Sequence, residues 1–392
     1  MKKNSLLFTI SACLCLMIFF LSSCKKEIET IEIQVDDLFS EEERAILSKS
    51  LDLNKFFHLT HLTQSEQYQV FLGRALFYDN HLSGDKSVAC ASCHQQELAF
   101  ADNVALSRGA NDNLTDRNSI SLASFGSFED HYGGTHGGGD FVDNSFFWDE
   151  RTGEITEQLT QTLANPNEMG MPFHELGSRV AELEYAQILY EKAFGTTDIR
   201  SENVVQSIAA FVNRIESSNS SFDTNLQMSR FDLFEDFPLF SEAENNGKRL
   251  FAENCASCHA FSLSPFMRHQ FDNLSSVASN GLEMEYADAG VGRHTLATED
   301  LGVFKIPGLR NVALTAPYMH DGRFESLEDV MDFYSEGIQP HPNLDEKLKD
   351  ENGNPKRMNF TDTEKAELVL FLKTLTGTTH LENPSLADPF RS

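Results

Sequence analysis

The sequence predicts a mainly helical chain, with two units in tandem and long loops around them. Three observations support this fold class. Apolar residues recur at helical spacing in several segments. Alternating strand patterns are scarce, and one short motif, Cys-Ala-Ser-Cys-His, occurs at 90–94 and again at 255–259. The 392 residues are enough for two domains of ordinary size and a tether.

Helical patterns occupy residues 68–77, 155–163, 182–194, 203–216, 243–251, 326–334 and 361–375. The last can begin at Thr361 or Thr363, both suitable N-caps, and Gly377 follows its end. The first and fifth form an internal repeat, because Gly-Arg-Ala-Leu-Phe (73–77) and Gly-Lys-Arg-Leu-Phe (247–251) each precede a Cys motif. The polar run 217–224 marks the predicted junction between an N-terminal domain, 51–224, and a C-terminal domain, 225–392.

Each Cys-x-x-Cys-His motif has the spacing that attaches c-type haem, with two thiols for the vinyl groups and a histidine for the iron. Zinc, a redox dithiol and a structural disulfide are alternatives, but none explains why a histidine follows both pairs. A zinc site would need two pairs folded together, whereas these lie 165 residues apart. We therefore expect two covalently bound haems in two cytochrome c-type domains. Their attachment residues are Cys90, Cys93 and His94, and Cys255, Cys258 and His259.

The N-terminus has the pattern of a bacterial lipoprotein signal. Lys2 and Lys3 precede an apolar run, 6–21, that ends in Leu-Ser-Ser-Cys at 21–24. On this interpretation residues 1–23 are removed, Cys24 is lipidated, and the charged residues 24–50 form an acidic tether. An uncleaved transmembrane helix is the alternative, although the run is short for a span. Both interpretations place the remaining chain outside the cytoplasm, on the periplasmic side of a bacterial membrane.

Cysteine use agrees with this assignment. Of the seven cysteines, two lie in the predicted signal and one is Cys24, so the remaining four all belong to the Cys-x-x-Cys-His motifs and none is left for a disulfide. The formal charge of −29 becomes −31 without Lys2 and Lys3. Such a surface repels nucleic acid and anionic lipid, and it would steer a basic or mixed-charge electron donor towards the protein.

Further ordered segments accompany the two Cys motifs. They are Leu-Gly-Arg-Ala-Leu-Phe (72–77), Phe-Ala-Asp (100–102), Arg-Asn-Ser (117–119), Phe-Trp-Asp-Glu-Arg (147–151), Glu-Met-Gly (168–170), Phe-Lys-Ile-Pro-Gly-Leu-Arg-Asn-Val (304–312) and Thr-Ala-Pro-Tyr-Met-His-Asp-Gly (315–322). In this order they resemble the bacterial dihaem cytochrome c peroxidases, the family that includes MauG. Glu150 departs from the family's usual glycine, and the insertion 127–145 has no counterpart there.

The resemblance implies an enzyme in which the first haem reacts with hydrogen peroxide and His94 is its proximal ligand. Many family peroxidases carry a blocking histidine sixteen residues after the proximal one, and Ala110 stands at that place here. A site open without prior reduction is therefore implied. His131 and His136, in a glycine-rich loop of the insertion, are the alternative ligands for this iron.

Two side chains are candidates for the peroxide chemistry. Cleavage of the O–O bond needs a group that takes a proton from the near oxygen and returns it to the leaving one. Glu168 matches the family's distal glutamate, and an apolar haem pocket would raise its pKa towards a useful range. Gln158 matches an amide that hydrogen-bonds peroxide or water. Without the resemblance, a turn acid and a helix-surface glutamine would explain them as well.

Three further roles are implied by the resemblance. Trp148, the only tryptophan, matches a position between the haems where an indole can carry an electron or hole, although a core tryptophan is the ordinary alternative. Asn118 and the carbonyls of Thr315 and Pro317 match an inter-haem calcium site, whose oxygen ligands suit that ion. Seen alone, these three residues would suggest only turns.

The sixth ligand of the second haem distinguishes the branches of the family. Peroxidases use a methionine fourteen residues after the histidine of His-Asp-Gly, and the same count from His320 reaches Tyr334. MauG-like proteins have tyrosine there, and phenolate oxygen lowers the iron's potential relative to a thioether. In the alternative, Tyr334 packs in a helix and Met331 or Met319 binds the iron.

These residues leave two classes of function open. The first is a peroxidase that reduces hydrogen peroxide to water with electrons from a small redox protein, or from a protein side chain oxidised at a distance as MauG does. The second is a non-enzymatic electron-transfer or peroxide-sensing cytochrome. Glu168 and Gln158 favour the first, because a plain carrier needs no acid–base groups over its iron. Many relatives are dimers, so a homodimer is also an open expectation.

Overall fold

The computed structural model describes residues 38–56, 59, 62–123, 145–217, 219–263 and 275–391. The predicted signal, the lipidation site Cys24, and the loop histidines His131 and His136 lie outside these residues. Among the described residues no helix has the length and apolar character that a membrane span requires. The expectation of a mainly helical chain is confirmed, since the two strands named, β1 (Val277–Ala278) and β2 (Phe304–Lys305), form one short antiparallel pair.

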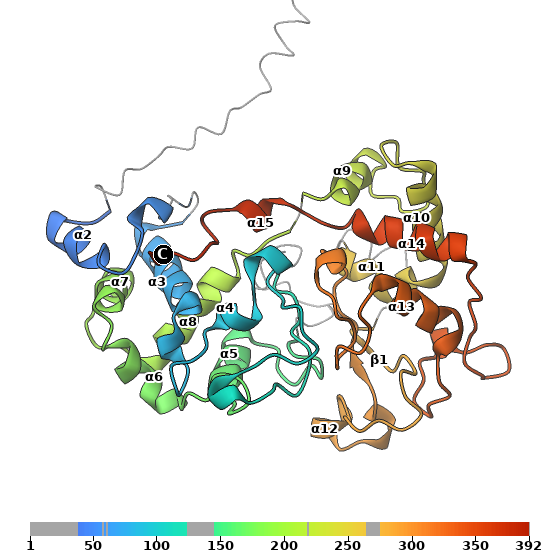
Figure 1. Cartoon of the computed structure of the whole chain (residues 1–392), viewed down its shortest axis with the longest axis horizontal. Helices are drawn as coiled ribbons and strands as arrows, with labels where there is room; N and C mark the ends of the chain where they lie inside the picture. The colour runs from blue at the N-terminus through green and yellow to red at the C-terminus, as the bar shows by residue number, and fades with distance from the viewer. Residues whose placement is uncertain are drawn as a thin grey trace, which may run out of the picture.

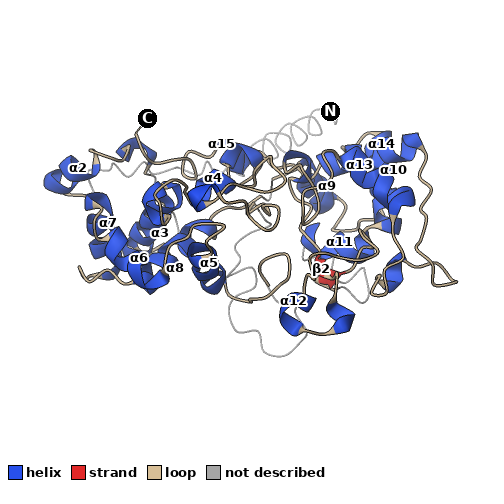
Figure 2. Cartoon of the chain, turned by 60° about the horizontal axis from the view of Figure 1, so that its bottom comes forward, coloured by secondary structure: helices blue, strands red, loops and turns tan. Residues whose placement is uncertain are grey.

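Two groups of helices lie side by side in both views, each around its own apolar core (Figures 1 and 2). The first group comprises α2 (Glu41–Leu47), α3 (Gln64–Tyr78), α5 (Ile155–Ala164), α6 (Phe173–Val180), α7 (Glu184–Phe194) and α8 (Ser201–Val212). The second comprises α9 (Ser221–Met228), α10 (Glu242–Asn254), α11 (Ala256–Leu263), α13 (Leu327–Asp332) and α14 (Asp362–Lys373). A smaller cluster around Phe333 and Ile338 lies in the second half of the chain.

Short elements connect these groups. Single-turn α-helices are α4 (Cys90–Cys93), α12 (Gly292–Thr295) and α15 (Thr379–Glu382), and Phe333–Gly337 is a π-helix, η9. The 3-10 turns are Leu53–Lys55, Asn80–Leu82, Gln96–Leu98, Ala110–Asp112, Thr298–Asp300, Val312–Leu314 and Glu346–Leu348.

The predicted helices all form, and capping boxes fix the starts of α3, α10, α13 and α14. α3 begins earlier than the apolar pattern because Thr63 and Glu66 make a reciprocal capping box. Ser241 and Glu244 do the same for α10, and Thr361, not Thr363, caps α14. The pattern predicted at 326–334 divides into α13 and the π-helix.

The internal repeat places a glycine at the same helix crossing in each core. A Cβ added to Gly73 of α3 would lie 1.7 Å from the carbonyl oxygen of Ser207 in α8. A Cβ added to Gly247 of α10 would lie 1.9 Å from the carbonyl oxygen of Glu367 in α14. Only glycine permits these close approaches. Four residues after each glycine, a phenylalanine meets another across the crossing, with ring centroids 5.2 Å apart for Phe77–Phe211 and 5.0 Å for Phe251–Phe371.

We expect Gly73→Ala and Gly247→Ala each to lower the free energy of unfolding by about 3 kcal/mol, because backbone must move to admit the methyl group. Gly153→Ala is the matched control, since a Cβ there meets no atom within 4 Å. Chemical denaturation of the three variants checks this expectation. Unchanged stability in both crossing variants would show that the helix pairs can separate without cost.

A buried cation follows each crossing glycine. Arg74 donates its Nε and both Nη atoms to the carbonyls of Ala387, Lys55 and Pro384 at 2.6–2.7 Å. Lys248 donates to the carbonyls of Leu233 and Glu235 at 2.6 and 2.7 Å. Both cations therefore fasten loops onto the crossing helices.

The last residues, 376–391, which we name the C-terminal strap, leave α14 and return to the first core (Figure 1). Leu386 packs in that core, and Phe390 bridges to Leu51. Gln96 donates its amide to the carbonyls of His380 and Asn383 at 2.7 and 3.0 Å. The chain end thus belongs to the first core, although it follows the second in sequence.

His380 is buried in this strap, and neither nitrogen of its ring has a hydrogen-bond partner. Burial lowers its pKa to about 4, so the folded protein keeps the ring neutral. The neutral ring therefore imposes no penalty on folding above the ordinary histidine pKa of about 6.5. As the pH falls from there towards 4, the unfolded chain binds a proton more readily than the folded protein, and the free energy of unfolding decreases.

In the wild type, protonation of His380 should lower the free energy of unfolding by at most about 1.4 kcal/mol for each pH unit between about pH 6.5 and 4. We expect His380→Asn to remove this part of the pH dependence. Thermal unfolding at stepped pH measures this, with the more exposed His174→Asn as the control. An acid limb that is identical in wild type and His380→Asn would contradict it.

Candidate active site

Both Cys-x-x-Cys-His motifs form a tight helical turn that gathers two thiols and a ring. The amide of His94 donates to the carbonyl of Cys90 at 3.0 Å, and the amide of His259 donates to that of Cys255, also at 3.0 Å. The four described cysteines are free thiols. Burial raises the pKa of Cys90 and of Cys255 to about 12. No disulfide therefore joins the cysteines of the described chain.

Each motif histidine is oriented by a main-chain carbonyl. Nδ1 of His94 lies 2.8 Å from the carbonyl oxygen of Phe100, and Nδ1 of His259 lies 3.2 Å from that of Pro307. An Nδ1–H that donates to a carbonyl makes Nε2 the metal-binding nitrogen and fixes the ring plane. With two thiols beside each ring, these residues fit covalently attached haem. The carbonyl partners were not predicted, although both lie in segments noted in the sequence.

Glu168, which follows α5, and Gln158, in its first half, share Thr162 as a hydrogen-bond partner. Asn165 donates its amide to Oε1 of Glu168 at 2.7 Å, and Gln158 donates to the hydroxyl of Thr162 at 3.1 Å. Burial raises the pKa of Glu168, while hydrogen bonds from Thr162 and Asn165 partly oppose that rise. Thr162 thus lies between the two candidates, a role that its position four residues after Gln158 could have suggested.

The carboxylate also lies near the first Cys motif. Burial is the main cause of the raised pKa of Cys90 and of Cys93, and the charge of Glu168 adds a smaller rise to both. The structure therefore brings Glu168 to the motif of His94.

Ala110 packs directly behind Glu168. It is fully buried, and its amide donates to the carbonyl of Glu168 at 2.7 Å. A Cβ on the preceding Gly109 would lie 2.3 Å from the carbonyl oxygen of Asn167, so the two loops touch through their backbones. Asp85 accepts the amide of Asn111 at 2.7 Å and secures the turn. The loop around Ala110 is thus held against the backbone of Glu168.

Tyr334 lies in the π-helix η9, a distortion that is frequent at functional sites. Burial raises its pKa to about 12, a hydrogen bond with Asn280 opposes this, and the charges of Cys255 and Cys258 add smaller rises. The phenol is therefore close to the second Cys motif.

The two alternative methionines lie in different places. Met331 is buried in the second core. Met319 packs in the small cluster with Tyr334, and Asn280 donates its amide to the Met319 sulfur at 3.6 Å. Tyr334 and Met319 are thus neighbours around Asn280, whereas Met331 is a core residue.

Trp148 and Asn118 are joined by a hydrogen bond. The indole Nε1–H donates to the carbonyl of Asn118 at 2.9 Å, and the Trp148 side chain is buried. The carbonyl of Trp148 accepts the amide of Lys305 in β2 at 2.7 Å. Trp148 therefore lies between chain segments from the two halves of the sequence.

The three predicted calcium ligands approach one another through the backbone. The amide of Asn118 donates to the carbonyl of His320 at 2.8 Å, which places it beside the loop of Thr315 and Pro317. The Asn118 side chain donates its NH₂ to the carbonyls of Val104 and Ala105 at 3.1 and 3.3 Å. Its oxygen is therefore the atom suited to a cation.

Carboxylate-rich metal sites are absent from the part of the chain that the structure describes, where no group of three or more His, Cys, Asp or Glu side chains is placed to hold an ion. A calcium ion here would depend on amide and carbonyl oxygens.

Comparisons with known proteins find similar dihaem peroxidases. A family model described as di-haem cytochrome c peroxidase matches residues 67–230. The methylamine utilization protein MauG of Methylorubrum extorquens is 29% identical over 311 residues, with 78% of each chain covered. The cytochrome c551 peroxidase of Nitrosomonas europaea is 28% identical over 319 residues, covering 78% of this chain and 79% of its own. Together these matches support the dihaem cytochrome c peroxidase and MauG family for this chain.

Solved structures extend the likeness to the whole fold. A MauG-like protein associated with microbial copper homeostasis is 29% identical, with a TM-score of 0.67, and covers 86% of this chain and 97% of its own. The diheme peroxidase BthA of Burkholderia thailandensis shares the fold at 19% identity, with a TM-score of 0.61 and coverage of 80% and 87%. The family model and the named relatives indicate an oxidoreductase of the cytochrome c peroxidase class.

Proposed function

We propose that this protein is a dihaem peroxidase that reduces hydrogen peroxide to water, with one haem in each core. Haem c bound at the two Cys motifs supplies the redox-active iron. The observation that carries the proposal is that Glu168 lies near enough to Cys90 and Cys93 for its charge to raise their pKa, and that Thr162 bonds to both Glu168 and Gln158. Ala110 supports a site that reacts without prior reduction, because its methyl group cannot ligate iron.

Glu168 handles the proton. Its carboxylate takes a proton from the peroxide oxygen nearer the metal and returns it to the oxygen that leaves as water. Asn165 and Thr162 hold the carboxylate in one orientation, and burial raises its pKa towards the operating pH. Gln158, fixed by its bond to Thr162, offers its amide to peroxide or water.

Trp148 and Tyr334 are assigned to electron transfer. We assign Trp148 as the relay between the two cores, since its side chain is buried between the two halves of the chain. Tyr334 would supply an oxygen ligand to the haem held at the second Cys motif, and such a ligand would favour sharing of oxidising equivalents over electron entry from a weak donor. Asn118, Thr315 and Pro317 would hold a calcium ion through their oxygen atoms, and the ion would stiffen this junction.

The electron source distinguishes two versions of the proposal. A small redox protein with a basic face suits the net charge of −29. Oxidation of a protein side chain at a distance is the second version, and the tyrosine at position 334 favours it. The proposal also includes a division into domains 51–224 and 225–392, a lipid anchor at Cys24 and a homodimer. A non-enzymatic cytochrome remains the alternative.

The deciding experiment mixes the fully oxidised protein with one equivalent of hydrogen peroxide, without a reductant. We expect rapid peroxide loss, with spectral changes at both haems, and a resting spectrum with one high-spin and one low-spin haem. Two low-spin haems that ignore peroxide would contradict the proposal and favour the carrier. A reaction that starts only after pre-reduction would contradict the role given to Ala110.

A further inference from the structure

Three consecutive residues, 148–150, are each bonded to the second half of the chain. The carbonyl of Trp148 accepts the amide of Lys305 at 2.7 Å, and the carbonyl of Asp149 accepts Nε2 of His294 at 2.8 Å. The carboxylate of Glu150 lies 3.0 Å from Nζ of Lys305. Trp148 therefore lies in a three-residue segment in which every residue contacts the second half of the chain.

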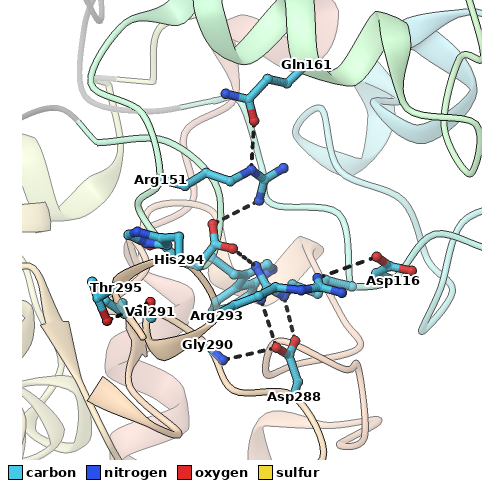
Figure 3. A network of polar contacts seen from close by, with 12 residues as sticks. Asp116, Arg151, Gln161, Asp288, Gly290, Val291, Arg293, His294 and Thr295 are labelled. Atoms are coloured by element: carbon cyan, nitrogen blue, oxygen red, sulfur yellow. Dashed lines mark hydrogen bonds and ion pairs between the residues drawn. The ribbon is translucent and has the colours of Figure 1, made fainter. Parts of the chain in front are cut away.

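A buried ion-pair network strengthens this tie (Figure 3). Nη1 of Arg117 lies 2.8 Å from the carboxylate of Asp149. Nε and Nη2 of the same guanidinium donate to the two carboxylate oxygens of Asp288 at 2.6 and 2.9 Å. Arg151 donates to the other oxygen of Asp149 at 2.9 Å. The side chains of Arg117 and Asp149 are only 8% and 1% exposed. Separating the two side chains would leave a buried charge without a partner, so breaking the ion pair is strongly destabilising.

This network encloses the hydrogen bond of the indole. Arg117 precedes Asn118, whose carbonyl accepts the indole N–H, and Asp149 follows Trp148, which donates it. The ion pair between Arg117 and Asp149 thus closes a ring that includes the hydrogen-bonded pair. Arg117 also reaches the second half of the chain through Asp288, so one guanidinium fixes the indole against both halves.

Glu150 makes further contacts with the second half of the chain, but its backbone adopts an unfavourable conformation. Its φ is +50°, a region that non-glycine residues seldom adopt, and the family motif has glycine there. In return, its carboxylate accepts the hydroxyl of Ser276 at 2.7 Å as well as the contact from Lys305. Glycine would relieve the backbone but could make neither contact.

We propose that Arg117 and Glu150 are positioning residues that hold the Trp148 indole at one distance and in one hydrogen bond, and so set the rate of electron transfer between the haems. This inference rests on the relay role proposed above. With both haems bound, Trp148 would give one electron towards the first haem and regain one from the second, so the indole would be unchanged overall. Peroxide is the oxidant and takes up two electrons and two protons to form water.

The test uses the protein with both haems and two readouts. Ultraviolet resonance Raman spectroscopy reports the hydrogen bond of the indole N–H, and Trp148 is the only tryptophan, so the band needs no assignment. Stopped-flow absorbance reports the rate at which the second haem is oxidised after peroxide is added. Trp148→Phe gives the rate without the relay.

We expect Arg117→Lys, which keeps the charge but loses the planar fork, to shift the indole band and slow the transfer about tenfold. Glu150→Gln should shift both readouts in the same direction by a smaller amount. Arg293→Gln is the matched control, because Arg293 pairs with Asp116 at the rim of the same network at 3.6 Å and both side chains are more than half exposed. It should leave both readouts unchanged.

An unchanged indole band in Arg117→Lys and Glu150→Gln would overturn the positioning role. A shifted band with wild-type transfer rates would overturn its link to electron transfer, while peroxide turnover by the same samples would leave the proposed function intact. If Arg117→Lys does not fold with two haems, Glu150→Gln alone decides between these outcomes. Absence of peroxide turnover in the wild type would contradict the proposed function instead.

Discussion

Glu168→Gln is expected to lower the rate of peroxide turnover by about 100-fold or more, the usual contribution of a positioned general acid–base group. The amide keeps the size of the side chain and can still meet Asn165, but it cannot accept and return a proton. Both haem spectra should stay nearly unchanged, because Glu168 is assigned to proton transfer and not to iron ligation. Steady-state loss of peroxide at saturating donor measures the effect.

The control for this variant is Glu175→Gln, an exposed acid in the first turn of α6. It removes the same charge from the same domain and should leave turnover unchanged. Normal turnover in Glu168→Gln would remove Glu168 from the mechanism.

The pH dependence gives a second check on the same residue. Burial raises the pKa of Glu168 above the ordinary glutamate value, so the carboxylate is lost at a higher pH than in a free side chain. Wild-type turnover should therefore fall as the pH drops through that raised pKa, and this limb should be missing in Glu168→Gln.

Tyr334→Phe is expected to raise the reduction potential of the second haem by on the order of 0.1 V, because an anionic oxygen ligand that stabilises ferric iron is removed. The first haem should keep its potential and spectrum, since Tyr334 lies near Cys255 and Cys258. A spectroelectrochemical titration resolves the two haems.

Tyr190→Phe is a suitable control, because it removes a buried phenol of the first core that donates to the carbonyl of Asp198 at 3.0 Å. Its potentials should match the wild type. If Tyr334→Phe also matches the wild type while Met319→Leu moves the second haem, the sulfur of Met319 is the ligand and the assignment of Tyr334 is wrong.

Local sequence features predicted the helices well and the details of the site less well. The capping residues and apolar spacing that start α3, α10 and α14 are local, so the patterns found the helices from the chain alone. The π-helix at Tyr334 replaces the end of a predicted α-helix, and no spacing signals that change. The return of the C-terminal strap to the first core was also unpredicted, because it depends on contacts such as Arg74 with Pro384.

Residue types at short spacing or in fixed order predicted the two haem-attachment motifs, the family resemblance and the candidates at 148, 158, 168 and 334. The side chains that hold these candidates in place could be found only in the folded chain. Arg117 and Asp288 are 171 residues apart in sequence yet form a buried fork, and Thr162 joins Gln158 to the surroundings of Glu168. Such partners are selected by burial and by the geometry of hydrogen bonds, which exist only after the distant segments have packed together.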